Sequence, residues 1–414
     1  MDLQDKVISF FSDKLPETPS IHLEKMTIHH LLSMNVGHHD NIYGNVASEK
    51  DWVKAFLSQE IQHEPGSYYR YSTHSTYMLA AILERVTGQN LVDFLMPRLF
   101  EPLGISRPVW ETCPMGITAG GMGLSVPTEG IARFGQMLLE KGKYGGRRIV
   151  SEAYIELATQ EQSDNRRDEV RADSAQGYGY QFFLCRQGCF RGGGAFGQLC
   201  FVSPEQRIVI AATSSLSSGN ELQVLLDLVY EHLIHKSKEE IVPNLDERDL
   251  LQQQLSKMTD GIPIHPFGND LCQTPNYRSY RMNGNPQGIR CIEFSPLGSG
   301  SELHIHYENG DHKRLLFDCK EPVIFQDRFV KDLSLHLQEV VSYAGWEDER
   351  TLKLTLVYIE TPYIVTYTLK FIEEKLELHC AMNVSLNKAN FEITGTHADK
   401  VEKDEEKPEL RGNP

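Results

Sequence analysis

The chain has 414 residues, of which 40% are hydrophobic, and its 57 acidic and 41 basic side chains give a formal net charge of -16. This length is sufficient for one large core or two ordinary ones, and two domains are the expectation. The negative charge argues against binding to nucleic acid or to anionic membrane surfaces, because phosphate contacts need a surplus of Lys and Arg.

The N-terminal residues do not resemble an export signal. Residues 1–20 contain acidic side chains throughout and lack the apolar stretch of a signal peptide, and no run is as long as a membrane-spanning helix. The eight cysteines show no CxxC spacing, which predicts neither a zinc site nor a disulfide framework. We expect reduced thiols, no metal and no cofactor, in a protein that is cytoplasmic as encoded, with export left open if residues precede Met1.

Three helices are predicted in the first half of the chain. Residues 26–34 place Ile28, Leu31 and Leu32 on one face behind Thr27 as N-cap. Residues 72–87 have a helical apolar period that Gly88 ends. A further helix is predicted to begin near Pro127 and to end before Gly142, with Ile131, Phe134 and Leu138 directed inward.

From Tyr178 the pattern changes to strands. Four short strand-like runs are followed by a helical pattern over 219–237, which predicts an antiparallel meander that ends in a helix. Beyond a charged linker, strands recur about every ten residues with alternating faces. We predict one domain over 1–240, a linker over 241–276, a small antiparallel β domain over 277–396 and a disordered acidic tail over 397–414.

Three stretches in this order resemble the β-lactamase-related serine hydrolases, which include class C β-lactamases, penicillin-binding proteins and esterases. They are KMTIHHLLSMNVGH (25–38), EPGSYYRYSTHSTYMLAAILERVTG (64–88) with its continuation to PLGI at 105, and AGGMGLSVPTEGIARFGQMLLEKGKYGG (119–146). The resemblance spans roughly residues 3–215. It implies an α+β fold of the β-lactamase/transpeptidase type, an antiparallel sheet flanked by helices, followed here by a C-terminal all-β barrel or sandwich.

Two catalytic positions are carried over from this resemblance. Tyr71 matches the tyrosine of the family's Tyr-x-Asn element, which relays protons between nucleophile and leaving group, and Thr73 stands where the family has Asn. The alternative for Tyr71 is an aromatic side chain that packs at the start of a helix.

The segment FRGGGAFGQ (190–198) resembles the family's Lys/His-x-Gly strand, whose backbone aligns substrate and completes an oxyanion hole. Arg191 stands near the Lys/His position, and Gly193 and Gly194 allow a close approach of substrate. The planar guanidinium of Arg191 suits a substrate carboxylate. The alternative is a solvated strand residue.

The family's nucleophile and activating lysine, Ser-x-x-Lys, do not accompany these stretches. The sequence contains this pattern once, at Ser385–Lys388, in a strand-rich region of the second domain where no helix presents the lysine to the serine. In the family this pair lies upstream of the segment that matches residues 3–34. We therefore expect strands and a nucleophile helix to be missing, an unpaired edge of the central sheet, and a Tyr71 phenol without the lysine that lowers its pKa.

The other motifs are weaker indications of a functional site. GGGAFG (192–197) satisfies GxGxxG, but a strand is expected to follow it rather than the helix of a dinucleotide site. His232 with His235, and His304 with His306, could each ligate a metal, yet neither pair has an obvious third ligand, and solvated or packed histidines are expected. The sequence has neither a GxSxG elbow nor an HExxH motif.

The sequence thus predicts a serine hydrolase lineage for esters, amides or peptides, inactive as written. The alternative is a non-catalytic protein that binds a peptide or small molecule, and a weaker idea is that the β domain binds an apolar ligand. Expected partners are a small molecule or peptide, with an oligomer conceivable through the exposed sheet edge.

Overall fold

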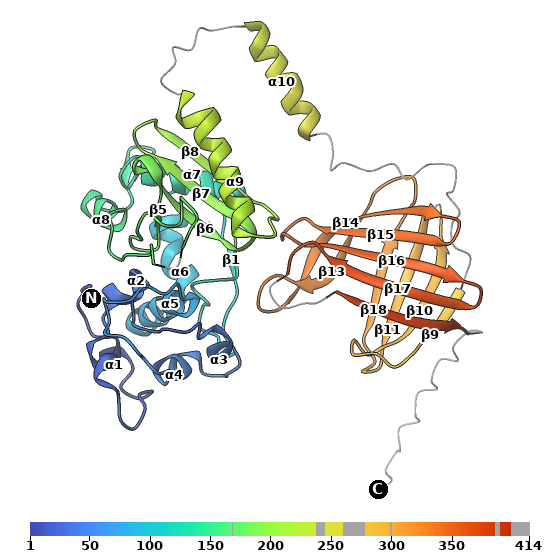
Figure 1. Ribbon diagram of the computed structural model, residues 1–414, viewed down its shortest axis with the longest axis horizontal. Helices are drawn as coiled ribbons and strands as arrows, with labels where there is room; N and C mark the ends of the chain where they lie inside the picture. Colours follow the sequence, from blue (N-terminus) through green and yellow to red (C-terminus); the bar gives the residue numbers. More distant parts are fainter. Residues whose placement is uncertain (168, 237–244, 260–277, 299, 386–389, 399–414) are drawn as a thin grey trace. The chain divides into compact units, whose positions relative to one another are not determined.

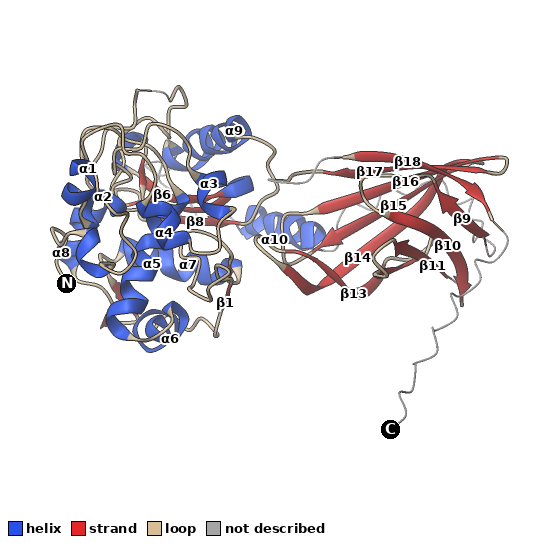
Figure 2. Ribbon diagram, turned by 90° about the horizontal axis from the view of Figure 1, so that it is seen from below, coloured by secondary structure: helices blue, strands red, loops and turns tan. Residues whose placement is uncertain are grey.

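A computed structural model describes residues 1–167, 169–236, 245–259, 278–298, 300–385 and 390–398. Its contacts divide the chain into two units, Met1–Val242 with Val330–Leu335, and Pro243–Phe329 with His336–Pro414. The first unit mixes helices with short strands, whereas strands dominate the second (Figures 1 and 2). The fold class therefore agrees with the prediction of an α+β domain followed by a β-barrel domain.

The helices of the first unit are mostly short, and several begin at a residue whose side chain accepts a backbone N–H, which satisfies a donor that the helix itself leaves unpaired. They are α1 (Ile21–Lys25), α2 (Ile28–Leu32), α3 (Tyr43–Ala47), α4 (Trp52–Leu57), α5 (Thr73–Thr87), α6 (Leu91–Leu95), α7 (Thr128–Leu139), α8 (Glu152–Ala158) and α9 (Gly219–Val229).

Four of these helices, α2, α5, α7 and α9, were predicted from the sequence. In α2, Thr27 is the N-cap and forms a reciprocal capping box with His30. Helix α5 ends at Gly88, whose φ of +68° is the left-handed conformation that glycine adopts without strain. Helix α7 begins directly after Pro127.

The main sheet of the first unit is antiparallel, with strand order β5-β6-β7-β8. Its strands are β5 (Phe183–Leu184), β6 (Phe190–Gly194), β7 (Gln198–Ser203) and β8 (Ile208–Ala212), and two small hairpins pair β1 (Val109–Trp110) with β2 (Leu124–Ser125) and β3 (Lys143–Tyr144) with β4 (Arg147–Arg148). The predicted meander is therefore present, although its first strand is only two residues long. Strand β8 is an unpaired edge among the described residues.

Helices cover both faces of this sheet. Cys200 and Val202 of β7 belong to the core that forms with α7, whereas Leu199 and Phe201 belong to the core that forms with α9. Adjacent residues of a strand point to opposite faces, so this alternation places the sheet between two helical layers.

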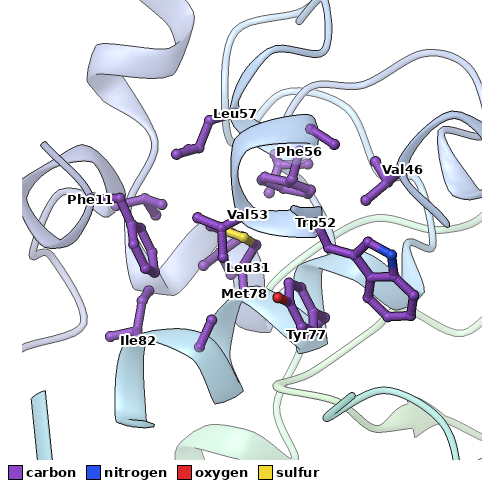
Figure 3. Packing of buried hydrophobic residues seen from close by; sticks show 14 of the residues in the cluster. Phe11, Leu31, Val46, Trp52, Val53, Phe56, Leu57, Tyr77, Met78 and Ile82 are labelled. Atoms are coloured by element: carbon purple, nitrogen blue, oxygen red, sulfur yellow. The ribbon is translucent and has the colours of Figure 1, made fainter. Parts of the chain in front are cut away.

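A separate core surrounds α5. Its buried face contacts side chains from α2, α3, α4 and the N-terminal residues, and Figure 3 shows this packing. The residues shown there with labels are Phe11, Leu31, Val46, Trp52, Val53, Phe56, Leu57, Tyr77, Met78 and Ile82. This core fixes α5, and with it Tyr71, which lies two residues before the helix begins.

The segment Val330–Leu335 joins the first unit although it connects two strands of the second. Glu111, which is 5% exposed, accepts hydrogen bonds from the backbone N–H groups of Leu333 and Ser334 and from the Ser334 hydroxyl, at 2.8–3.0 Å. Asp332 accepts one from the N–H of Gly123 at 2.9 Å. The Glu111 carboxylate therefore holds this segment through three charge-assisted hydrogen bonds.

The second unit is a ten-stranded antiparallel near-barrel with strand order β12-β11-β10-β9-β18-β17-β16-β15-β14-β13. Its strands are β9 (Arg278–Met282), β10 (Ile289–Leu297), β11 (Gly300–Tyr307), β12 (His312–Phe317), β13 (Val323–Val330), β14 (Leu335–Asp348), β15 (Thr351–Tyr358), β16 (Ile364–Ile372), β17 (Lys375–Met382) and β18 (Phe391–His397). The barrel alternative was therefore right.

The interior of the near-barrel is filled by side chains. Apolar residues at alternate positions of the strands have no exposed surface, including Leu303, Ile305, Leu315, Leu352, Leu354, Leu356 and Leu369. Lys313 of edge strand β12 and Asp327 of edge strand β13 form a largely buried ion pair of 2.7 Å. The Tyr358 hydroxyl donates to Asp327 at 2.6 Å. The idea of an apolar ligand inside the barrel gains no support from this packing.

Two segments predicted from the sequence, the linker and the tail, either differ from the structure or lie outside the described residues. The interval predicted as a linker contains helix α10 (Leu245–Thr259), because the sequence LDERDLLQQQLSKMT is rich in helix-forming residues. Most of the predicted disordered tail lies outside the described residues, which end at 398. The seven cysteines in the described part of the chain are free thiols, and no helix in that part has the length and apolarity needed to cross a membrane.

Candidate active site

Tyr71 lies at the start of α5, two residues before its first helical position. Its ring stacks on Phe183 of β5 at 6.1 Å between ring centres and meets Tyr178 edge to face at 6.5 Å. The residue is 44% exposed, yet the packing around its phenol raises the pKa of Tyr71, and the charge of Arg191 opposes that rise in part. The structure thus brings together Tyr71 and Arg191, two positions that the sequence had placed 120 residues apart.

Arg191 is not a solvated strand residue, because it is 3% exposed. Its guanidinium lies over the ring of Phe183, 4.3 Å from the ring centre, and Nη2 donates to the Ser174 hydroxyl at 3.0 Å and to the carbonyl of Asp173 at 3.3 Å. The carboxylate of Asp173 is engaged elsewhere, with Arg186 at 2.6 Å.

The guanidinium of Arg191 is incompletely paired. Nε is buried without a hydrogen-bond partner, and no carboxylate in the described part of the chain lies within ion-pair distance of Arg191. A buried cation without a counter-charge is costly, by several kcal/mol in general. Such an arrangement is chemically suited to an anion brought by a ligand.

Gly193 makes room for this side chain. A Cβ at Gly193 would clash with Nη1 of Arg191, which shows that the guanidinium lies over the strand at this position. A Cβ at Gly192 would meet its nearest neighbour, Cys200, at 4.0 Å, and one at Gly194 would meet Gln198 at 3.1 Å. The glycine run therefore has a local structural requirement at Gly193, while the substrate-binding role of Gly193 and Gly194 stays a prediction.

Two further phenols lie beside Tyr71 and Arg191. Tyr69 and Tyr178 have ring centres 5.3 Å apart, and burial raises the pKa of both while the charge of Arg191 acts in the opposite direction. The hydroxyl of Tyr69 is buried without a hydrogen-bond partner. The site is thus an aromatic cluster of protonated phenols around one cation.

Thr73 is the first residue of α5, and its side chain and carbonyl pack against Gly121. A Cβ at Gly121 would lie 2.5 Å from the Thr73 carbonyl oxygen. The assignment of Thr73 to the position of the family's asparagine stays a prediction.

Gln181 is a residue that the sequence did not single out. Its φ is +67°, a strained conformation for a residue other than glycine. Its side chain donates to the carbonyl of Leu32 at 3.0 Å and accepts from the Thr76 hydroxyl at 2.7 Å. Gln181 thereby links the end of α2, the first turn of α5 and the segment that carries Tyr178 and Phe183, and no sequence signal indicated it.

The weaker motifs remain separate from this cluster. GGGAFG is followed by strand β7, as expected. His235 contacts Gln187, and His232 lies 3.9 Å from Glu231, so this pair does not share a partner. Ser385 belongs to the described residues, but Lys388 of the same motif lies outside them.

Comparison with known proteins gives a family-level match. A family model described as Beta-lactamase matches residues 1–232, more than half of the chain. A curated 6-aminohexanoate-dimer hydrolase from Paenarthrobacter ureafaciens is 34% identical over 89 residues, which are 21% of this chain and 23% of that protein. The match therefore spans about a quarter of the length of that relative.

Solved structures show lower identity. A protein from Bacillus anthracis, provisionally named a 6-aminohexanoate-dimer hydrolase, is 23% identical with a TM-score of 0.47, over 59% of this chain and 68% of that chain. An octameric penicillin-binding protein homologue from Pyrococcus abyssi is 17% identical with a TM-score of 0.44, over 95% of this chain and 82% of that chain.

Proposed function

The chain belongs to the beta-lactamase family, and we propose that residues 1–414 form a serine-hydrolase scaffold that binds an acyl compound without forming an acyl-enzyme. The supporting observation is the combination of the cluster of Tyr71 and Arg191 with the lack of a Ser-x-x-Lys pair in residues 1–232. Nucleophile and activating base act as a unit, and the loss of one member removes most of the rate.

The raised pKa of Tyr71 supports the same proposal. A phenol whose pKa lies above the ordinary value of about 10 is almost entirely protonated at neutral pH, so it can donate a hydrogen bond to a ligand but cannot accept the proton of a nucleophile. Among the described groups, Arg191 is the cation that acts on this pKa. In a longer chain with Ser-x-x-Lys ahead of Met1, the same residues would serve an ester or amide hydrolase.

Hydrolysis of a chromogenic ester and of a chromogenic β-lactam tests the proposal. We expect residues 1–414 to show no turnover above that of a Tyr71→Phe variant. A form extended upstream to include an in-frame Ser-x-x-Lys would turn over substrate, and its Ser→Ala variant would not. Turnover by residues 1–414 that a single serine substitution abolishes would overturn the proposal.

A second candidate function, that of a non-catalytic protein that binds a peptide or small molecule, is supported by the buried guanidinium of Arg191, whose Nε has no hydrogen-bond partner among the described residues. Its natural counterpart would be a carboxylate on a peptide or small molecule. A relative matched over 89 residues is named for a dimer of 6-aminohexanoate, which is an amino acid with a carboxylate. An oligomer through the unpaired edge of β8 stays a further prediction.

The linear dimer of 6-aminohexanoate and its C-terminal amide form a matched pair of probes. We expect the carboxylate form to raise the melting temperature, since a ligand at 100 times its Kd stabilises by about 2.7 kcal/mol. The amide should have little effect, and Arg191→Lys should reduce the response. Equal stabilisation by the two probes would exclude Arg191 as the carboxylate partner.

A further inference from the structure

Three histidines converge on the outer face of the near-barrel. His304 and His306 lie two residues apart on β11, and His312 on β12 is the direct cross-strand partner of His306. Their neighbours Leu303 and Ile305 are fully buried in the interior, so the alternation of the strand directs both histidines of β11 outward. The sequence had shown the first two of these residues but no third ligand.

The three rings are as close as a shared ion would require. Ring centres are 4.7 Å apart for His306 and His312, 5.0 Å for His304 and His312, and 6.4 Å for His304 and His306. Imidazoles that share one zinc ion through Zn–N bonds of about 2.0–2.1 Å have ring centres on the order of 5 Å apart.

Two carboxylates fix which nitrogens face this cluster. His304 Nε2 lies 2.8 Å from Glu302, and His306 Nε2 lies 3.3 Å from Glu293. Because a carboxylate only accepts, each Nε2 carries the proton and each Nδ1 is left with a lone pair, which at His304 accepts from His312 Nε2. Histidine ligands of metals commonly donate their other N–H to a carboxylate in this way.

Two carboxylates and one guanidinium are the charged groups beside the cluster. Arg314 is paired with Glu302, which uses its other oxygen for His304, and Glu293 adds a second negative charge. Together Glu302, Glu293 and Arg314 have a net negative charge, which favours a cation at the cluster.

We propose that His304, His306 and His312 form a site for a divalent transition metal ion such as Zn²⁺, with Glu302 and Glu293 orienting the ligands. The ligand atoms are Nδ1 of His304, Nδ1 of His306 and Nε2 of His312. Three histidine ligands leave the fourth position of a tetrahedral ion open. Imidazole also suits copper and nickel.

Metal binding requires a local rearrangement. As the structure stands, no group of three or more His, Cys, Asp or Glu side chains among the described residues could hold a metal ion. Nδ1 of His304 and Nε2 of His312 share a hydrogen bond of 2.9 Å, and the rings of His304 and His312 are nearly parallel, at 10°. The ion would replace the shared proton, and the rings would fan apart to direct their lone pairs toward it.

Competition for Zn²⁺ between the full chain and a chromophoric chelator tests this site. We expect one site that His306→Ala and His312→Ala each abolish, and that Glu302→Gln weakens by about 10–100-fold. His379→Gln, on β17 of the same near-barrel, is the matched control and should bind like the parent chain.

Cobalt provides a second readout, which reports directly on the atoms that ligate the ion. Co²⁺ at a tetrahedral site with histidine ligands absorbs visible light, and this band should appear with the parent chain and the His379→Gln variant but not with His306→Ala. Zn²⁺ affinity that is the same in the parent, His306→Ala and His312→Ala chains would overturn the proposal, as would the lack of saturable Zn²⁺ binding. Either result would leave a hydrogen-bonded histidine cluster only.

Discussion

Arg191 acts on three phenols at once, those of Tyr69, Tyr71 and Tyr178, and at each of them its positive charge opposes the effect of burial on the pKa. Burial is the larger influence in all three cases, so the phenols stay protonated at neutral pH. At this scale the site is equipped to donate hydrogen bonds and to pair with an anion, which are functions of binding rather than of proton abstraction.

Removal of the cation should move the Tyr71 titration in a defined direction. With Arg191→Met, we expect the pKa of Tyr71 to rise further, because the positive charge that favours its phenolate is lost. The measurement is an absorbance titration of tyrosinate, with the Tyr71→Phe chain subtracted to isolate one residue among the 17 tyrosines. An unchanged or lower pKa would show that Arg191 does not act on this group.

Buried histidines predict acid sensitivity of the first unit. His38 and His74 have at most 1% exposure, their ring nitrogens have no hydrogen-bond partner, and burial lowers the pKa of each to about 4. The unfolded chain, with a histidine pKa of about 6.5, binds more protons between these values. Stability is therefore fully present above pH 6.5 and is lost as the pH falls toward 4, by on the order of 3 kcal/mol per histidine.

Urea unfolding at several pH values checks this dependence. His74→Phe should flatten the loss between pH 6.5 and 4, since the apolar ring cannot bind a proton. His232→Gln, at a half-exposed position near the end of the first unit's last helix, should leave the profile unchanged. An equal pH profile for His74→Phe and the parent chain would contradict the assignment.

Strand β6 offers a test of the glycine run at the scale of an element. Gly193→Ala places a methyl group against the guanidinium of Arg191, whereas Gly192→Ala meets its nearest neighbour at 4.0 Å. We expect Gly193→Ala to destabilise by about 1–3 kcal/mol through overpacking, and Gly192→Ala to change stability by about 0.5 kcal/mol or less. Chemical denaturation compares the two variants. Equal effects would mean that Gly193 does not make room for Arg191.

The segment Val330–Leu335 depends on Glu111 in a similar way. Glu111→Gln removes the charge from three hydrogen bonds to Leu333 and Ser334, and each charge-assisted bond contributes about 1.5–3 kcal/mol. We expect faster proteolytic cleavage within 330–335, while Glu152→Gln, a surface control, should have no effect. Cleavage at the parent rate would show that these bonds do not hold the segment.

Elements with a strong local signal were predictable from sequence. Helix α5 combines a helical apolar period with a glycine at its end, and α2 has a Thr N-cap. The strands β9, β13, β14 and β18 were not located individually from the sequence, although β14 has 14 residues. The segment of helix α10 was predicted as a linker because it is charged and its apolar residues show only a weak helical period. Its high content of helix-forming residues would have indicated a helix.

The candidate site could be predicted in part. A family resemblance pointed to Tyr71 and Arg191, and the structure brings both to one cluster. Gln181, with its strained backbone and bonds to α2 and α5, has no signature in a single sequence. The burial of Arg191 was equally hidden, because it results from tertiary packing with Phe183 and Ser174 rather than from the pattern of the strand.

At the scale of the whole molecule, the chain forms two units with separate cores, as its length of 414 residues predicted. The first unit belongs to a family of serine hydrolases, and the second is a filled near-barrel whose outer face has the histidine cluster. The first unit has the fold of the family, and residues 1–232 contain no Ser-x-x-Lys pair, so we propose that this unit does not form a bond to a substrate.

Covalent labelling measures this claim most directly. Residues 1–414 are incubated with a fluorophosphonate probe and with a labelled penicillin, and the products are mapped by peptide mass spectrometry, with an intact penicillin-binding protein as positive control. The account predicts no stoichiometric adduct on any serine of the chain. A stoichiometric adduct on one serine, lost when that serine is changed to alanine, would contradict it.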